Sequence, residues 1–279
     1  MKIPFTKMEG AGNDYIYVDA TKVDILDPNK VAKIVSDRHF GIGGDGLVMI
    51  CDSDIADFRM RMFNADGSEG KMCGNATRCI AKYVYDHGMV KGLETSLDTL
   101  SGIKYIDMFL GPDDKVAKAR VDMGKPIFEA EKIPTTLEPA FGGVIQKDGV
   151  DYTLHCVSMG NPHAIMLVDD VHQADVHGIG PKLENDEHFP ERCNIEFVKV
   201  INRDLVQMRV WERGSGETLA CGTGACATAV ALMKLGLVNN RVDVELIGGT
   251  LTIQWEEGES VFMTGPATEV FTGEIEIDL

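Results

Sequence analysis

The chain has 279 residues, which at about 150 residues per domain predicts roughly two domains. Hydrophobic residues make up 44% and charged residues 25%, values typical of a folded globular protein, which excludes long disorder, collagen and coiled coil. The formal net charge is −17, without the basic surface of a protein that binds nucleic acid or an anionic membrane, so we expect neither partner.

The cysteines and the start of the chain predict a cytoplasmic protein. Seven cysteines, an odd number scattered over a long chain, do not form a disulfide framework, so some thiols stay free in a reducing compartment. The first residues, MKIPFTKMEGAGNDYIYVDA, contain no apolar core of a secretory leader. No stretch approaches 18 consecutive apolar residues, so we expect no membrane span.

The predicted elements are mostly short strands. Runs of β-branched or aromatic residues, most of them bounded by Gly or Asp, predict strands over 16–18, 47–50, 58–63, 105–110, 165–168, 195–200, 205–211, 242–247 and 251–255. A helix is predicted over 28–38, with a proline near its start. Two further helices are predicted over 73–86 and 221–235, and each is followed by a glycine suited to the helix C-terminus.

These two helices belong to an internal repeat. Cys73-Gly74 and Cys221-Gly222 are 148 residues apart, and the same offset superposes the strands before them and the glycines after them. The second helix is small or apolar almost all round, which is typical of a buried helix. The sequence therefore predicts an ancient duplication, with a sheet wrapped around a central helix in each half.

The repeated Cys-Gly elements, FNADGSEGKMCGNATRC and WERGSGETLACGTGAC, indicate acid/base chemistry. A cysteine at a helix N-terminus lies near unpaired N–H groups and the positive end of the dipole, which lowers a thiol pKa. The amides of the next residues can hold a carboxylate. Two such elements related by pseudo-two-fold symmetry suit the inversion of a carbon centre, because one sulfur removes a proton and the other delivers one.

Other interpretations of these motifs are weaker. Free cysteines are often buried small hydrophobes, and this explanation suits the remaining five, namely Cys51, Cys79, Cys156, Cys193 and Cys226. The cysteine spacings are not C-x-x-C and no His cluster accompanies them, so we expect no metal site. The sequence GIGGDG at 41–46 fits neither a dinucleotide fingerprint nor a P-loop, and no lysine has the context of a pyridoxal Schiff base, so we expect no cofactor.

At the two Cys-Gly elements the chain resembles the diaminopimelate epimerase family, cofactor-independent isomerases of lysine biosynthesis. The resemblance extends over nearly the whole chain through MEGAGNDYIYVD, RHFGIGGDG, MGKPIFEAEKIP, SMGNPHA, ERCNIEF, GGTLTIQW and MTGPATEVFTGEI. It implies an α/β (α+β) fold of two pseudo-symmetric domains, each a mostly antiparallel strand barrel around a central helix. It places the active site in the cleft between them and implies epimerisation of LL- and meso-diaminopimelate.

The resemblance also assigns roles by position. Cys73 and Cys221 match the thiol pair, and Glu212 matches the acceptor of the substrate amino group and a tuner of the nearby thiol. His163 resembles a residue near the thiols that tunes their pKa, although a polar strand residue is an equally good interpretation. The substrate-binding residues implied are Asn13, Asn64, Gly74, Asn75, Asn161, Asn194, Glu212, Arg213, Gly222 and Thr223. Without the resemblance, Asn13 and Asn161 would be taken for turn formers.

The expected domains are residues 1–120, completed by C-terminal strands at about 266–279, and residues 121–265. The resemblance suggests a homodimer. Two positions depart from the family: Ala76 stands where glycine is common and Gly46 where some members have glutamine, which puts substrate strictness in doubt rather than reaction type.

Two rival functions stay open at this point. A proline- or hydroxyproline-type racemase uses a similar cysteine pair, but its substrates have no distal amino-acid end for Arg213 and the asparagines to bind. A thiol redox or metal-binding protein without turnover is the alternative from another class.

Overall fold

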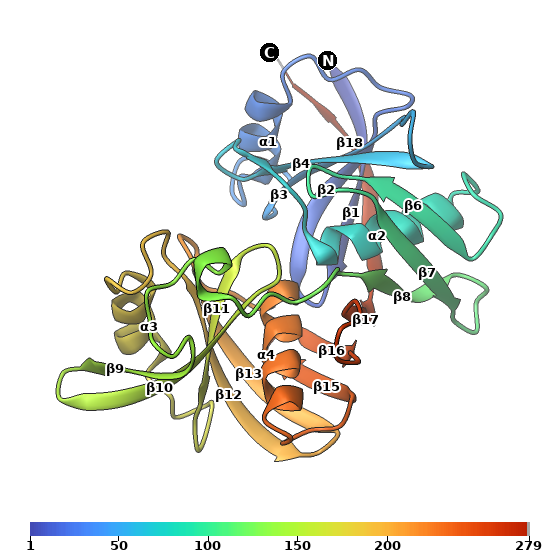
Figure 1. Ribbon diagram of the computed structural model, residues 1–279. Helices are drawn as coiled ribbons and strands as arrows, with labels where there is room; N and C mark the ends of the chain where they lie inside the picture. The colour runs from blue at the N-terminus through green and yellow to red at the C-terminus, as the bar shows by residue number, and fades with distance from the viewer. Residues whose placement is uncertain (278–279) are drawn as a thin grey trace. The chain divides into compact units, whose positions relative to one another are not determined.

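The computed structural model describes residues 1–277, which form a mixed α/β fold of two compact units (Figure 1). Unit 1 comprises Met1–Val121 and the chain from Thr264 onward, and unit 2 comprises Asp122–Met263. The C-terminal strands expected at 266–279 include residues 278 and 279, which lie outside the described residues. Among residues 1–277 no helix is long and apolar enough to cross a membrane.

Within residues 1–277, four α-helices and one short 3-10 helix connect many strands. The helices are α1 Pro28–Ser36, α2 Gly74–Asp86, α3 Val176–Glu184, α4 Gly222–Lys234 and η1 Ala130–Lys132. The strands of unit 1 are β1 Lys2–Gly10, β2 Asn13–Asp19, β3 Gly46–Cys51, β4 Phe58–Asn64, β5 Glu69–Gly70, β6 Glu94–Asp98, β7 Lys104–Leu110, β8 Val116–Asp122 and β18 Thr268–Glu276. Those of unit 2 are β9 Phe141–Lys147, β10 Val150–Ser158, β11 Pro162–Leu167, β12 Asn194–Asn202, β13 Leu205–Glu212, β14 Gly216–Glu217, β15 Arg241–Leu246 and β16 Gly249–Gln254. β17 Phe262–Pro266 carries the chain from unit 2 back to unit 1.

The strands of unit 1 pair in a mixed pattern. β1 pairs antiparallel with β18 and β2, and β2 pairs parallel with β3. β3 and β4 are antiparallel, β4 and β6 are parallel, and β6, β7 and β8 continue antiparallel. Helix α2 packs against β1, β2, β7 and β18. A cluster of buried hydrophobic side chains packs α1 against the strands. It includes Val31 of α1, Ile16 of β2 and Phe63 of β4.

Unit 2 repeats this strand pairing at the offset read from the sequence. Tyr15 pairs with Gly46 between parallel β2 and β3, and His163 pairs with Asn194 between parallel β11 and β12. Both pairs are shifted by 148 residues. The antiparallel pairs that follow, β3 with β4 and β12 with β13, keep the same shift. Helix α4 packs against strands β10, β11, β12, β15 and β16 (Figure 1).

The two predicted Cys-Gly helices are present, and nearly every residue in both is buried. Each begins one residue later than predicted, because the cysteine itself is the extended N-cap residue. Gly88 and Gly236 follow the helix ends with φ of 69° and 71°, which only glycine adopts without strain. The predicted C-terminal glycines are thus confirmed by their backbone.

Gly88 offers a clean test of this local explanation. A Cβ added there meets nothing within 4 Å, so Gly88→Ala introduces only the left-handed backbone strain. We expect it to lower the free energy of unfolding by about 1 kcal/mol in urea denaturation. Gly92→Ala is the control, because its Cβ is 3.9 Å from the nearest atom and its φ is not positive. Equal stability of the two variants would contradict the explanation.

Some elements differ from the prediction. Helix α3 was not predicted, because Gly178, Gly180 and Pro181 all disfavour a helix; Asp175 caps it by accepting from the Gly178 N–H at 2.9 Å. Helix α1 ends at Ser36 and not at residue 38. Asp37 ends it, since its carboxylate accepts from the next turn at the N–H groups of His39 and Phe40. Several strands, among them β1, β8 and β10, were also not predicted.

Candidate active site

Cys73 and Cys221 both stand at the N-cap of a 13-residue helix. Their backbones are extended, with φ and ψ of −134° and 120° for Cys73 and −119° and 107° for Cys221. The carbonyl of each cysteine accepts the first helical hydrogen bond, at 2.9 Å in both cases. Each sulfur therefore lies beside the first turn of a helix, a position that suits an anion.

In unit 1 the Cys73 thiol bonds to the amide of Asn13, which in turn accepts from the amide of Asn75. Its Sγ donates to Asn13 Oδ1 at 3.3 Å, and Asn75 Nδ2 lies 3.4 Å from the same oxygen. The other end of the Asn13 amide donates to Asp45 Oδ2 at 2.7 Å. Because a carboxylate only accepts, Asp45 fixes the Asn13 amide with its oxygen toward the thiol.

Asp45 belongs to a partly buried charged group. Burial raises its pKa, with the nearby Asp14 charge as a second cause. Arg38 contacts Asp45 at 3.1 Å and Asp14 at 2.8 Å, and Lys7 pairs with Asp14 at 2.5 Å. The RHFGIGGDG segment therefore holds Asn13 through Asp45, a role that its glycines alone did not indicate.

Arg78 orients the side-chain amide of Asn75. Its guanidinium is fully buried and donates to Asn75 Oδ1 at 2.9 Å, to the Gly74 carbonyl at 3.3 Å and to the Pro266 carbonyl at 3.1 Å. Since Arg78 only donates, the Asn75 amide is oriented with Nδ2 toward Asn13. Arg78 was not among the predicted site residues. The signal in the sequence was a charged residue within a helix whose other residues are mostly buried.

In unit 2 the Cys221 thiol is more deeply buried, with 5% of its surface exposed. Its Sγ accepts from the Gly224 N–H at 3.4 Å and lies 3.5 Å from Thr223 Oγ1. The helix N-terminus lowers the pKa of this thiol through the Gly224 N–H, as expected, but larger opposing effects outweigh it. Burial raises its pKa well above the usual range, and the charges of Glu212 and Glu196 add to the effect of burial. The resting sulfur is therefore a protonated thiol at neutral pH.

Glu212 is a carboxylate that accepts a hydrogen bond from this thiol. Burial raises its pKa, while hydrogen bonds from Thr218 and from the Cys221 thiol oppose that shift. The Thr218 hydroxyl donates to Glu212 Oε1. A partly buried carboxylate that accepts from a thiol is suited to take or return its proton.

A chain of hydrogen bonds also leads from Cys221 into the interior of unit 2. Asn161 Nδ2 donates to Thr223 Oγ1 at 3.2 Å, and Asn161 Oδ1 lies 3.1 Å from His163 Nε2. His163 Nδ1 lies 2.6 Å from Glu196 Oε1, and both residues are fully buried. Glu196 was not predicted, because nothing in its local sequence marks it.

Three other predicted residues lie in local hydrogen-bond networks. Asn64 donates to Ser68 Oγ at 3.0 Å in the turn after β4. Asn194 accepts from the Arg213 N–H at 2.8 Å and donates to the Pro162 carbonyl at 2.9 Å. The Arg213 guanidinium donates to the Glu191 carbonyl at 2.9 Å.

The other cysteines have the environments of packing residues. All seven are free, and burial raises the pKa of Cys79 and Cys156 to about 12. Cys193 and Cys226 are fully buried as well. Cys51 is partly exposed and packs on the core beside α1. Among residues 1–277 no group of three or more His, Cys, Asp or Glu side chains has a geometry suited to a metal ion.

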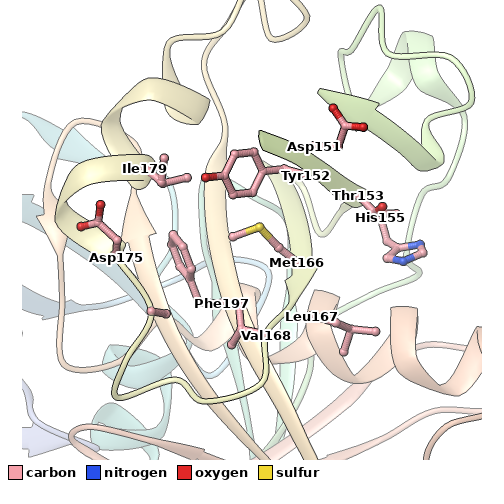
Figure 2. Close-up of a pocket in the computed structure, with 11 residues that line it drawn as sticks. Asp151, Tyr152, Thr153, His155, Met166, Leu167, Val168, Asp175, Ile179 and Phe197 are labelled. Carbon is pink, nitrogen blue, oxygen red and sulfur yellow. The ribbon is translucent and has the colours of Figure 1, made fainter. Parts of the chain in front are cut away.

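Unit 2 also contains a cavity of about 450 Å³ (Figure 2). It is lined by side chains from β10, β11, β12 and α3, including Tyr152, His155, Met166, Asp175 and Phe197. None of the predicted site residues lines it.

Comparison with known proteins agrees with the motifs. The family model described as diaminopimelate epimerase matches residues 5–129 and 155–270. A diaminopimelate epimerase of Methanococcus maripaludis strain C6 is 53% identical over 276 residues, covering 98% of this chain and 99% of the relative. One from Leptospira biflexa is 50% identical over 281 residues, covering 99% of this chain and all of the relative.

Solved structures share the fold at lower identity. A Bacillus anthracis protein of the PhzF phenazine biosynthesis family has a TM-score of 0.74 at 17% identity, covering 99% of this chain and 100% of that one. A probable proline racemase from Agrobacterium radiobacter K84 has a TM-score of 0.70 at 14% identity, covering 99% of this chain and 93% of that one. The family that the sequence motifs indicated is confirmed by the full-length relatives: the chain belongs to the diaminopimelate epimerase family.

Proposed function

We propose that the protein interconverts LL- and meso-diaminopimelate, with Cys73 and Cys221 as its acid/base pair. The observation that carries this proposal is the placement of both thiols at the N-cap of a matching helix, in a chain 53% identical to a diaminopimelate epimerase. The relative's name supplies the substrate, and the two N-caps supply a sulfur and an anion-binding helix turn in each unit.

The reaction needs both a base and stabilisation of charge. The α-proton of an amino acid is weakly acidic, so its removal needs donors on the adjacent carboxylate, where negative charge develops. In our proposal this carboxylate is held by the backbone amides of Gly74, Asn75, Gly222 and Thr223, and the chain itself supplies the stabilisation without a cofactor.

Proton transfer then involves one sulfur on each face of the α-carbon. One cysteine, as thiolate, takes the α-proton and becomes a thiol, while the other, as thiol, gives its proton to the opposite face and becomes a thiolate. We propose that Glu212, which accepts from the Cys221 thiol, binds the substrate amino group and tunes that thiol. We propose that His163 also tunes this thiol, and the hydrogen bonds from His163 to Asn161 and from Asn161 to Thr223 support this.

The distal amino-acid end of the substrate needs groups that recognise a zwitterion. We propose that Asn13, Asn64, Asn161, Asn194 and Arg213 supply them, since amides both donate and accept and an arginine can bind a carboxylate through two N–H groups. The bond between Asn194 and the Arg213 backbone links the positions of these two residues, which supports a shared role.

We propose that the two units are duplicated domains, and the pairing of β2 with β3 and of β11 with β12 at one constant offset supports this.

Two further predictions concern the setting in which the protein works. We propose a cytoplasmic protein, since thiol chemistry needs reduced cysteines. A homodimer stays a prediction, supported by the 54% and 48% exposure of Val270 and Phe271 on β18.

Deuterium incorporation tests the function directly. Incubation of the reduced protein with meso-diaminopimelate in deuterated water is expected to place deuterium at one α-carbon and to form the LL isomer, detected by mass spectrometry and chiral chromatography. Proline and trans-hydroxyproline are the comparison substrates, and we expect neither to exchange. Exchange with proline alone would assign the racemase function instead, and no exchange with any of the three would contradict both.

A further inference from the structure

Glu196 is a buried carboxylate that the fold does not account for. The residue is fully buried on β12, and its Oε2 has no hydrogen-bond partner among the described residues. An open carboxylate oxygen in the interior is costly, because it has given up water without a replacement. Such a group calls for an explanation other than packing.

The matching position in unit 1 shows that an apolar residue fits there. Val48, 148 residues before Glu196, occupies the same place in the parallel strand pair and is also fully buried. Tyr15 likewise takes the place of His163. The carboxylate and the imidazole therefore occur together in unit 2 and are absent together from the matched positions of unit 1.

The geometry links Glu196 to the thiol of Cys221. An ionised carboxylate only accepts, so Oε1 at 2.6 Å requires a hydrogen on His163 Nδ1. A neutral ring of this kind carries its lone pair on Nε2 and needs a donor there. The structure has Asn161 Oδ1, an acceptor, 3.1 Å from Nε2, so this contact is a hydrogen bond only when Nε2 carries a hydrogen, and the lone-pair form requires the Asn161 amide to turn. Glu196 also lies against the first turn of α4, where a Cβ on Gly224 would be 2.7 Å from Oε1 and 3.2 Å from Cys221 Sγ.

We propose that Glu196 is a positioning residue that locks the neutral His163 in the Nδ1–H tautomer, which leaves Nε2 as the ring atom that gains and loses a proton. With a proton on Nε2, the ring donates to Asn161 Oδ1. Without it, Asn161 turns its amide and donates Nδ2 to the Nε2 lone pair, so that Oδ1 faces Thr223. The change at Nε2 thus reverses the direction of the hydrogen bond between Asn161 and Thr223: the Thr223 hydroxyl accepts from Nδ2 in the first state and donates to Oδ1 in the second. Thr223 Oγ1 is 3.5 Å from the Cys221 sulfur.

This inference rests on the proposed epimerase function for its kinetic consequence only. The other titratable groups that interact with the His163 and Glu196 pair are Glu212, Cys156, Cys193 and Cys221. Of these, Glu212 is the one that also accepts from the Cys221 thiol, so its protonation belongs to the same network.

Nitrogen-15 NMR of the histidine-labelled full chain tests the proposal. At a pH where the His163 ring is neutral, the wild type is expected to show the Nδ1–H tautomer, and Glu196→Gln a mixture, because a glutamine both donates and accepts. His163→Gln assigns the signals. His155, another buried histidine of unit 2 whose Nδ1 has no partner, is the internal reference whose signals stay unchanged.

Kinetics supply the second measurement. We expect Glu196→Gln to lower kcat about 10- to 100-fold with KM within about twofold, and Glu196→Asp to recover part of the loss. An Nε2–H tautomer in the wild type, which is measured without substrate, would overturn the proposal whatever the variants do. So would an unchanged kcat in a Glu196→Gln protein whose tautomer has changed. Absence of diaminopimelate turnover in the wild type would instead contradict the proposed function and leave the tautomer result standing.

Discussion

Replacement of either Cys73 or Cys221 by alanine is expected to lower the rate of epimerisation by about 10²- to 10⁴-fold, the usual contribution of a positioned acid or base. The double variant is expected to be no slower than the slower single variant, because residues that act as one unit do not contribute additively. Steady-state turnover of LL-diaminopimelate measures the loss.

The single variants also make a stereochemical prediction. The thiol that remains in each can remove the α-proton that faces it and return a hydron to the same face, so exchange with solvent continues without inversion. We expect one variant to exchange only the LL isomer and the other only the meso isomer at the reacting carbon. Exchange of both isomers by either variant would contradict the assignment of one sulfur to each face.

Cys79→Ala is the matched control. Cys79 lies inside α2, the helix that Cys73 caps, and it is fully buried with its pKa raised to about 12. Its removal is expected to lower stability, because it leaves a small cavity, while epimerisation persists. A loss of turnover as large as that of Cys73→Ala would show that the effect comes from damage to α2.

The elements that local sequence predicts well are those with chemical markers at their ends. Helices α2 and α4 have a cysteine N-cap and a glycine with positive φ after the last turn, and both features are short-range. Helix α3 has a proline inside it, so its local preferences oppose its structure. It forms because Val176, Ile179 and Leu183 pack into the unit 2 core, which a local pattern does not reveal.

The residues of the candidate site fall into the same two groups, those that local sequence predicts and those that it does not. The two thiols and the amides on the first helical turns are predicted by the Cys-Gly motif, which occurs once in each unit. Asp45 and Glu196 do not, because their partners Asn13 and His163 lie 32 and 33 residues away along the chain. Parallel strand pairing brings them together: β2 lies beside β3, and β11 beside β12. A single sequence does not give the register of such pairs, so it does not show which distant polar group orients which site residue.

The same repeat therefore holds two different thiol environments. Cys73 donates to an amide oxygen that Asp45 orients, whereas the pKa of Cys221 is raised by burial and by two carboxylates, the partly buried Glu212 and the fully buried Glu196. The strand, cysteine and helix that recur in both units fix where the sulfurs lie, and the side chains that differ between the units decide how each sulfur holds its proton. The sequence motifs alone suggested two nearly equivalent cysteines.

Glu212→Gln is expected to lower epimerisation by about 10²- to 10⁴-fold while making the folded protein more stable at neutral pH. Burial raises the pKa of Glu212, so the folded state holds this proton more tightly than the unfolded state does. Stability is therefore lost as pH rises from the unfolded-state pKa through the folded-state pKa, and the full cost is present above both. Glutamine has no charge to bury, and its side-chain oxygen can still accept from Thr218.

Thermal melts from about pH 4 to about pH 8 test the sign of this effect. The excess melting temperature of Glu212→Gln over the wild type is expected to be largest at the alkaline end and to vanish at the acidic end. Glu217→Gln is the control with the opposite sign, because a hydrogen bond from Arg209 lowers the pKa of Glu217, and its neutral variant loses stability at high pH. A Glu212→Gln protein that melts lower than the wild type at neutral pH would show that the buried carboxylate stabilises the fold. Retention of full activity would remove Glu212 from the proton path to Cys221.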